Sequence, residues 1–343
     1  MSKSDIPHNI AVPRDDRVVP FQIEGLDVRG RVVRLGPAVD NIIMRHNYPP
    51  AVSSLLAEAV ALTVLLGSAL KFEGRFQLQT RSDGPVSMIV VDYDAPENIR
   101  ACARFNVDEL EKAVLAQKAC TASLMGNGHM ALTVDPGGNM KQYQGVVPLM
   151  NGSLEEAAHH YFEQSEQIPT RVRLAVAEAW DAQTGAPAHS WRAGGLIVQF
   201  MPSTGGRVTP QDLPPGDVPE GATVAEKPSE DDAWLEAVSL VQTIEDHELI
   251  DPALSSEQLL YRLFHERGVR VFDGLIIQEK CHCSEERVRN MLLSFSEDDK
   301  RHMADDVGTI GVTCDFCSTH YSFDLEALLA SEERTMPSLV HEP

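Results

Sequence analysis

Four cysteines near the C-terminal end constrain the fold more than any other feature of the sequence. Cys281 and Cys283 form one short pair, and Cys314 and Cys317 form a second pair after thirty intervening residues. Zn²⁺ is commonly held by four thiolates in tetrahedral geometry, supplied two at a time by short turns. The intervening residues are enough for two helices that return the second pair to the first. The spacing therefore predicts a small module that binds one Zn²⁺ per chain through these four cysteines.

The same cysteines are also compatible with permanent disulfides. However, the first residues, Met1 to Asp5, do not resemble a secretory signal, and disulfides persist mainly in oxidising compartments. We therefore expect reduced thiolates and a cytosolic protein. His282 offers an imidazole that also suits zinc, but with four thiolates available it is expected to be a bystander. The remaining cysteines, Cys102 and Cys120, lie alone in apolar surroundings and are expected to be buried small hydrophobic residues.

The overall charge bears on which kinds of molecule the protein can bind. The 343 residues carry 51 acidic and 29 basic side chains, a net charge of −22. This charge repels phosphate backbones and argues against a general nucleic-acid binder. The most apolar run, Ala59 to Leu70, is twelve residues long and too short to span a bilayer, so no membrane segment is expected.

Residues 1–202 are predicted to form an α+β domain with an antiparallel sheet and packed helices. Two turn-forming segments, Ser82 to Pro85 and Asp135 to Gly138, each separate a pair of β-rich runs and so predict hairpins. Pro50 to Leu70 is expected to be a buried helix. The predicted strands are Val18–Ile23, Val28–Leu35, Arg75–Arg81, Val86–Val91, Ile99–Phe105, His129–Val134, Gln142–Val147, Arg171–Glu178 and Trp191–Met201.

A second helix of this domain begins at the capping box Ser153 to Glu156 and runs to about Gln164. It carries His159 and His160, which point about 100° apart on a helix and so make a poor chelating pair. They are expected to be surface or packing residues. The region contains no Gly-x-Ser-x-Gly, phosphate-loop or His-Glu-x-x-His motif, so an enzyme is not indicated.

The composition changes after residue 202. Five prolines between Pro210 and Pro228, together with glycines, exclude regular structure, so this part is predicted to be a hinge. It begins a linker of residues 203–280. From Gly206 to Lys280 the linker carries sixteen acidic and six basic side chains. Such a charged segment is expected to have low local stability.

Two amphipathic helices are predicted inside the linker. One follows Ser229 and ends before Pro252, and the other runs from the Ser255 capping box to Gly268. Helices of this length are marginal alone, so they need a surface to pack on. They are expected either to pack on the first domain as ordinary core or to do so only while the zinc module holds them. Their apolar stripes are Trp234, Val238, Val241 and Ile244 in the first, and Leu259, Leu260, Leu263 and Phe264 in the second.

The module at residues 281–343 has few large apolar side chains. A unit of this size does not bury enough surface to fold unaided, whereas structural zinc contributes on the order of 10 to 16 kcal/mol. Because zinc binds thiolates, oxidation of the cysteines to disulfides is expected to remove most of this stability. Cys281 with Cys283, and Cys314 with Cys317, are the nearest pairs along the chain, so each is the natural resolving thiol of its neighbour.

The cysteine pairs, with Phe316 inside the second pair and Tyr321 after it, resemble the zinc centre of the bacterial redox-regulated heat-shock chaperones, the 33 kDa chaperonin family. The resemblance extends from about Val18 to Leu329. Its other motifs are, in order, Lys71-Phe72-Glu73-Gly74-Arg75-Phe76, Gln142-Tyr143-Gln144-Gly145-Val146-Val147-Pro148-Leu149, Ser165-Glu166-Gln167-Ile168-Pro169-Thr170, Ala193-Gly194-Gly195-Leu196 and Leu260-Tyr261-Arg262-Leu263-Phe264.

This resemblance implies an ATP-independent holdase that is inactive while reduced and zinc-bound. Oxidation would form the disulfides Cys281–Cys283 and Cys314–Cys317, release zinc, unfold the module and linker, and expose a surface for unfolded client proteins. Active members of the family are similarly described as homodimers. The segment Ser203 to Pro228 departs from the family in being longer and richer in proline.

Two other functions are compatible with these residues. A zinc-ribbon regulator or nucleic-acid-binding module would need a basic surface, which the acidic composition disfavours. A thiol-disulfide oxidoreductase that uses Cys314 and Cys317 as a dithiol would turn over with a thiol reductant. A holdase instead acts in roughly stoichiometric amounts.

Overall fold

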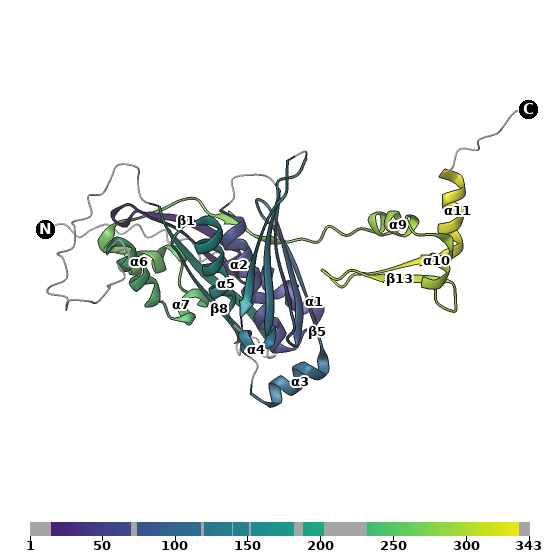
Figure 1. The fold of residues 1–343 in the computed structure, drawn as a ribbon, viewed down its shortest axis with the longest axis horizontal. Helices are drawn as coiled ribbons and strands as arrows, with labels where there is room; N and C mark the ends of the chain where they lie inside the picture. Colours follow the sequence, from purple (N-terminus) through teal and green to yellow (C-terminus); the bar gives the residue numbers. More distant parts are fainter. Residues whose placement is uncertain are drawn as a thin grey trace, which may run out of the picture.

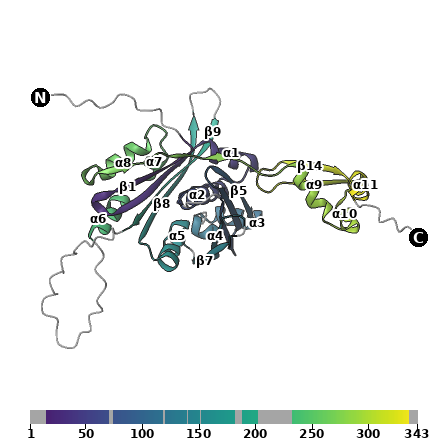
Figure 2. The same cartoon turned by 90° about the horizontal axis from the view of Figure 1, so that it is seen from above.

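The protein consists of a body with two β-sheets and a small module that projects from one end of the body (Figure 1). Seen from above, the chain leaves the body as a thin connection before the module begins (Figure 2). The predicted α+β class is confirmed, but the first domain contains two sheets where one was predicted. The computed structural model describes residues 15–69, 74–117, 120–138, 140–150, 152–181, 188–201 and 232–335.

The first sheet has the strand order β10-β1-β2-β9-β8, and β11 also pairs with β1. Its described pairs are antiparallel. Consecutive apolar residues occur in its strands because both faces are covered: Val33 belongs to the core on one side and Val32 to the core on the other. The strands are β1 (Arg17–Ile23), β2 (Val28–Leu35), β8 (Thr170–Asp181), β9 (Ala188–Phe200), β10 (Val269–Val271) and β11 (Leu275–Ile276).

The second sheet has the order β12-β5-β4-β3-β6-β7, antiparallel except for the parallel pair of β12 with β5. Burial alternates along β3, as predicted for a half-buried strand, because one face meets the core and the other meets solvent. Both predicted hairpins, β3–β4 and β6–β7, are confirmed. The strands are β3 (Arg75–Ser82), β4 (Val86–Asp94), β5 (Asn98–Phe105), β6 (Asn127–Asp135), β7 (Tyr143–Met150) and β12 (Gln278–Glu279).

Helix α2 (Pro50–Gly67) packs against strands of both sheets and forms the centre of the body. Of the described helices, it is the one with the length and composition of a membrane span, but 78% of that stretch is buried inside the protein. Its apolar composition is therefore accounted for by the two sheets. The other helices of this part are α1 (Pro37–His46), α3 (Val107–Leu115), α4 (Thr121–Met125) and α5 (Leu154–Tyr161), which continues into a π-helical turn at Phe162–Glu166.

Three linker helices, α6 (Asp232–Gln242), α7 (Asp246–Ile250) and α8 (Ser256–Phe264), cover the outer face of the first sheet. The four apolar residues predicted for the stripe of α8 are all buried. The Phe264 ring stacks on Phe21 of β1, with ring centroids 5.9 Å apart. These helices thus pack on the body as core in this structure.

The first linker helix differs from the prediction. It ends at Gln242, and α7 is a separate helix. The buried side of α6 consists of Ala233, Ala237 and Val241. Of the predicted stripe, Val241 and Ile244 are buried as expected, whereas Trp234 and Val238 are half-buried. Small alanine side chains let the helix approach the sheet closely, so the larger residues move to its flanks. The predicted hinge at residues 203–228 and the expected cap at Ser229 lie outside the described residues.

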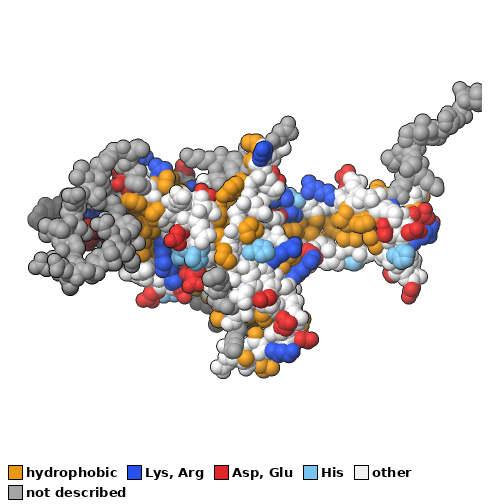
Figure 3. Space-filling model, viewed as in Figure 1, with side chains coloured by type: hydrophobic (Ala, Val, Ile, Leu, Met, Phe, Trp, Pro, Cys, Tyr) orange, Lys and Arg blue, Asp and Glu red, His pale blue; other side chains and the backbone are white. Residues whose placement is uncertain are grey.

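The C-terminal module is built on a hairpin and three helices. Its core contains five buried residues, Leu292, Ile310, Phe323, Leu325 and Leu328. Met291 and Phe295 lie outside this core and are 46% and 39% exposed. Hydrophobic side chains are visible along the module and its connection to the body (Figure 3). The elements are α9 (Glu285–Leu293), α10 (Glu297–Met303), β13 (Thr309–Thr313), β14 (His320–Asp324) and α11 (Leu325–Thr335).

Candidate metal centre

The two predicted cysteine pairs lie in turns at the end of the module that faces the body. Cys281 and Cys283 follow β12, and Cys314 and Cys317 lie in the turn between β13 and β14. The second turn is closed by a hydrogen bond from Ser318 N to Cys314 O, 2.9 Å long. The pairing of β12 with the body and the hairpin of the module thus present the two pairs to each other.

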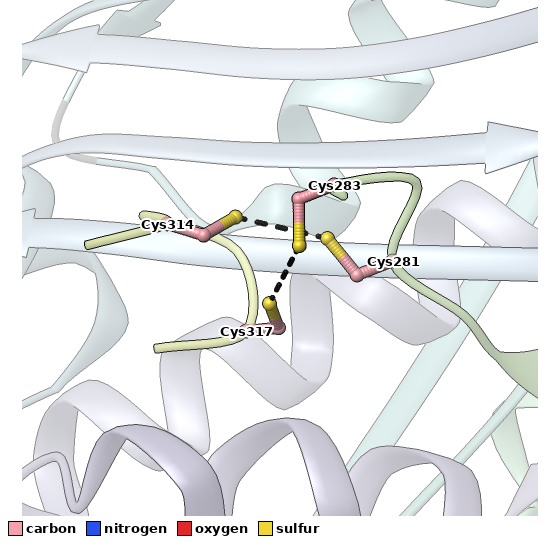
Figure 4. A group of neighbouring side chains, drawn as sticks. All are labelled: Cys281, Cys283, Cys314 and Cys317. Carbon is pink, nitrogen blue, oxygen red and sulfur yellow. Dashed lines mark hydrogen bonds between the residues drawn. The ribbon is translucent and has the colours of Figure 1, made fainter. Parts of the chain in front are cut away.

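The four sulfur atoms lie within 4.8 Å of one another (Figure 4). Two contacts join the turns: Cys281 Sγ lies 3.7 Å from Cys314 Sγ, and Cys283 Sγ lies 3.3 Å from Cys317 Sγ. Four sulfurs each about 2.3 Å from one tetrahedral Zn²⁺ would be about 3.8 Å apart. All four cysteines are free thiols in this structure. The cluster therefore has the size and the donor set to bind a metal ion.

The surroundings of the sulfurs affect their protonation in opposite directions. Burial raises the pKa of Cys283 to about 12, even though the Tyr321 hydroxyl donates to its sulfur at 3.2 Å. Burial also opposes ionisation of Cys317, but its hydrogen bonds with the backbone and hydroxyl of Thr319, the hydroxyl oxygen 3.2 Å from the sulfur, lower the pKa of Cys317 to about 7. Cys317 is thus the readiest of these two to become a thiolate. Several adjacent thiolates repel one another, so a bound cation is the natural way to keep all of them ionised.

His282 lies between the cysteines of the first pair in sequence but not among their sulfurs. Its Nε2 is 2.7 Å from Asp94 Oδ2 at the end of β4. Hydrogen bonds from Arg75 and His282 lower the pKa of Asp94 against the opposing effect of burial. In this position the imidazole joins the module to the body and is not directed at the cluster.

The two cysteines outside the cluster differ from each other. Cys102 is buried, as predicted, at 5% exposure on β5. The same prediction was wrong for Cys120, which is exposed. Cys120 precedes the first residue of α4, with its sulfur 3.2 Å from Ser123 Oγ, and the apolar residues Leu124 and Met125 take the buried positions of that helix.

The residues that dock the module on the body carry no local signal in the sequence. The Arg100 guanidinium on β5 donates to Asp92 at 2.9 and 2.6 Å, and its carbon lies 4.1 Å from the centroid of the Phe316 ring. Arg104 forms an ion pair with Asp315 at 2.8 Å. Alternation along β5 predicts a polar outer face, but nothing in the local sequence says that a distant turn covers it.

Comparison with known proteins places this arrangement in a family. The family model described as Hsp33 protein matches residues 16–324, a span that includes both sheets, the linker and all four cysteines. The chain belongs to the Hsp33 family. The 33 kDa chaperonin of Caulobacter vibrioides (strain NA1000 / CB15N) is 43% identical over 313 residues, which cover 90% of this chain and 95% of the relative. The 33 kDa chaperonin of Pseudomonas putida (strain KT2440) is 34% identical over 314 residues, covering 91% and 92%.

A solved Hsp33 structure supports the fold. The crystal structure of the 33 kDa chaperonin from Thermotoga maritima matches with a TM-score of 0.70 and covers 93% of this chain and 99% of that chain. At 21% identity this likeness concerns the fold alone. The family resemblance inferred from the sequence motifs is confirmed, and a four-cysteine cluster that could bind a metal ion is consistent with Hsp33 membership.

Proposed function

We propose that this protein is an ATP-independent holdase that is activated when its four-cysteine centre is oxidised. The observation that carries the proposal is the cluster of four free thiols within 4.8 Å, placed where the module meets the body. Its Hsp33 relatives are named 33 kDa chaperonins. When bound, one Zn²⁺ supplies the charge that keeps the thiolates together and links the two turns. The residues that would hold it are Cys281, Cys283, Cys314 and Cys317.

The switching step is oxidation of the sulfurs by a peroxide. One thiolate attacks the peroxide O–O bond and becomes a sulfenic acid, and the other oxygen leaves as water after protonation. A second thiolate then attacks the sulfenic sulfur, forms the disulfide and releases a second water. Each disulfide therefore passes two electrons to one peroxide. Two disulfides use all four thiolates, so no metal ligand remains.

The expected disulfides are Cys281 with Cys283 and Cys314 with Cys317. These partners are close along the chain and stay close when the module unfolds. In the folded cluster, the contacts of 3.7 and 3.3 Å run between the turns instead. Bridges between the turns would link them as a metal does, whereas bridges within each turn leave them free to separate. Mass mapping of peptides from the oxidised protein distinguishes the two patterns.

Loss of the module would then expose surfaces that bind unfolded clients. The five-residue core of the module does not sustain its fold without the metal. The linker helices would lose the neighbour that anchors their C-terminal end, and the apolar face they cover on the first sheet becomes available. We further propose that the active form is a homodimer in the cytosol. Basic and acidic side chains are interspersed on the face in Figure 3, which supports protein clients over nucleic acid.

One assay tests the function. The reduced, metal-loaded protein and the peroxide-treated protein are each added to a heat-denatured test protein, and light scattering reports aggregation. We expect suppression only by the oxidised form, at roughly one chaperone per client. The variant with both Cys102→Ser and Cys120→Ser keeps the four clustered thiols and should behave like the parent. Equal suppression by the reduced and oxidised forms would rule out redox control.

A companion measurement addresses the two alternatives. One zinc per chain should copurify with the reduced protein, and Cys281→Ser should abolish tight binding. Catalytic turnover of a disulfide substrate with a thiol reductant would favour a thiol-disulfide oxidoreductase. Salt-sensitive binding of a labelled oligonucleotide would favour a nucleic-acid-binding module.

A further inference from the structure

The two sheets of the body have four edges, and two of these, at β8 and β7, lie away from the module. At the β8 edge, side chains of α5 accept hydrogen bonds from the outward amides: Val172 N donates to His159 Nε2, and Leu174 N donates to the Glu155 carboxylate. At the β7 edge, Pro148 interrupts the row of amide donors. Neither the α5 side chains nor Pro148 belongs to the module, so the state of these two edges does not depend on it.

The other two edges, those of β1 and β5, are both covered by one segment of the chain, and this segment continues directly into the module. The cover is Val269–Lys280, here called the edge segment. Its strands β10 and β11 pair with β1, and β12 pairs with β5. At the β5 edge, Gln278 N donates to Glu97 O at 2.7 Å, and Lys280 N donates to Ile99 O at 3.0 Å. The next residue along the chain is the first cysteine of the cluster.

Few side chains hold the edge segment in place. Ile277 is its one buried residue, at 2% exposure, and it belongs to the large core between the sheets. Its neighbours Leu275 and Ile276 are 38% and 51% exposed. Backbone hydrogen bonds, Ile277, the half-buried Val269 and Val271 and the ion pair of Glu279 with Arg45 therefore attach a segment whose C-terminal end is fixed by the cysteine turn. When the module loses its fold, this attachment is the first that we expect to open.

The β5 edge is better suited than the β1 edge to accept another strand. β1 contains Pro20, which has no amide to donate, whereas β5 has no proline from Asn98 to Phe105. The module also covers the outer face of β5 through Phe316 and Asp315. Unfolding of the module would thus uncover the β5 edge and the face beside it together.

We propose that the β5 edge is a client-binding site, where an extended segment of an unfolded polypeptide adds to the sheet in the place of β12. This inference rests on the proposed holdase function and specifies how a client is held. Backbone hydrogen bonds to an edge strand are the same for every sequence, so one edge serves unrelated unfolded proteins. Such pairing also occupies the backbone groups of the client that would otherwise pair with another unfolded chain.

The contacts that β12 and the preceding Ile277 make with the body indicate which client segments fit best. Ile277 fills an apolar position of the core, and Glu279 forms an ion pair with Arg45 of α1. An extended segment with a branched aliphatic residue and an acidic residue two positions later reproduces both contacts, because residues two apart point to the same side of a strand. A client segment with a basic residue at the position of Glu279 would be repelled by the positive charge of Arg45 and would bind less well.

The test uses a peptide with the sequence of residues 275–280, Leu-Ile-Ile-Gln-Glu-Lys, carrying a fluorescent label. We expect it to bind the full-length oxidised protein and not the reduced, metal-loaded protein, in which the edge segment occupies the site. N-methylation at the positions of Gln278 and Lys280 removes the two amides that donate to β5 and should weaken binding at least tenfold. N-methylation at the position of Glu279, whose amide points away from β5, is the matched control and should have little effect.

Competition with a client completes the experiment. A chemically denatured test protein should displace the plain peptide from the oxidised protein. If the oxidised protein suppresses aggregation while the peptide stays bound, clients bind elsewhere and the edge inference is wrong, although the holdase function stands. A second contrary outcome is that the peptide methylated at Gln278 and Lys280 binds as tightly as the unmethylated peptide and the Glu279 control. In that case side chains and not backbone pairing with β5 provide the affinity, which also overturns the inference. An oxidised protein that suppresses no aggregation would refute the holdase function itself.

Hydrogen exchange locates the site independently of the peptide. Oxidation should increase deuterium uptake in the β5 region, residues 98–105, and client binding should reduce it again. The β8 edge, whose amides are paired with His159 and Glu155, should not change in either step. Protection by the client at β8 or β7 with none at β5 would overturn the assignment.

Discussion

The body and the module are held together by different means. The body has a central core of forty-three buried residues, and the module has a core of five. Stability in the body is spread over many contacts, so no single chemical event removes it. In the module we expect it to depend on one cluster of four sulfurs. The proposed switch uses this difference: an oxidant would unfold the module and leave the body folded.

The largest effect should follow from removing the metal under reducing conditions. Structural zinc contributes on the order of 10 to 16 kcal/mol in small domains, far more than five buried side chains provide. Chelation, or Cys314→Ser, should therefore abolish hydrogen-exchange protection in β13 and β14 but leave β3 and β4 protected. The control Cys120→Ser changes a cysteine outside the cluster and should retain both. A module that stays protected without metal would mean that its own core suffices to keep it folded.

The reverse experiment weakens the body alone. Leu62 lies fully buried in α2, between the two sheets. Leu62→Ala should lower the free energy of unfolding by about 2 to 5 kcal/mol, because it removes apolar contacts and leaves a cavity. Urea unfolding followed by circular dichroism measures the change. Zinc content below the unfolding transition should not change, and early loss of zinc would mean that the module depends on the body for its fold.

Much of the body could be predicted from local sequence, because its elements follow simple periodicities. Apolar residues at alternate positions predict β3, and a continuous apolar run predicts α2. The capping boxes at Ser153 and Ser255 predict two helix starts, and the structure confirms them. The proximity of the four cysteines was predicted from spacing alone. These signals depend only on residues close together in the chain.

The elements that connect the two regions could not be predicted in this way. β10, β11 and β12 are two or three residues long, too short for a periodicity, and they exist only because a sheet edge is available beside them. The pairing of Arg100 with Phe316 joins residues far apart in sequence. Cys120 has apolar neighbours along the chain, but exposure depends on which side of a short helix meets the core. Tertiary contacts decide all three features.

Acid should affect the stability of the body through two half-buried groups whose pKa shifts have opposite signs. Burial, followed by the charge of Arg171, lowers the pKa of His159 from 6.5 to about 4. Between these values the unfolded chain binds a proton that the fold does not, so stability falls as the pH falls from about 6.5 to 4. Burial raises the pKa of Glu58 from 4.5 to about 7, so in that window the fold binds the extra proton and stability rises as the pH falls.

Single substitutions separate the two contributions. Glu58→Gln should make the loss of stability below pH 6.5 steeper. His159→Gln should make it shallower, and the glutamine oxygen can still accept from Val172 N. Solvent screens part of each effect, so we expect about 1 kcal/mol between pH 7 and pH 5, measured as the shift in urea midpoint. Identical pH profiles for both variants would contradict these assignments.

The smallest predicted effect concerns the contact between the two regions. Arg100→Ala removes the cation–π contact with Phe316 and also the two hydrogen bonds to Asp92, which keeps the one from Gln77. A partly buried contact of this kind contributes about 1 kcal/mol, which corresponds to about a fivefold change in the undocked population. The zinc cluster should remain loaded, because none of its ligands is changed. The variant therefore tests docking separately from metal binding.

The rate at which Cys102 is alkylated measures how often the module leaves the body. Cys102 lies on β5 between Arg100 and Arg104, so it shares the outer face that the module covers, and it is 5% exposed. Alkylation of Cys102 in the reduced, metal-loaded protein, resolved by peptide mass, should be about fivefold faster in Arg100→Ala. The matched control Arg104→Ala removes an exposed ion pair with Asp315, which solvent screens, so its rate should hardly change. Equal rates in both variants and the parent would mean that backbone pairing of β12 with β5, and not side-chain contact, carries the coupling between module and body.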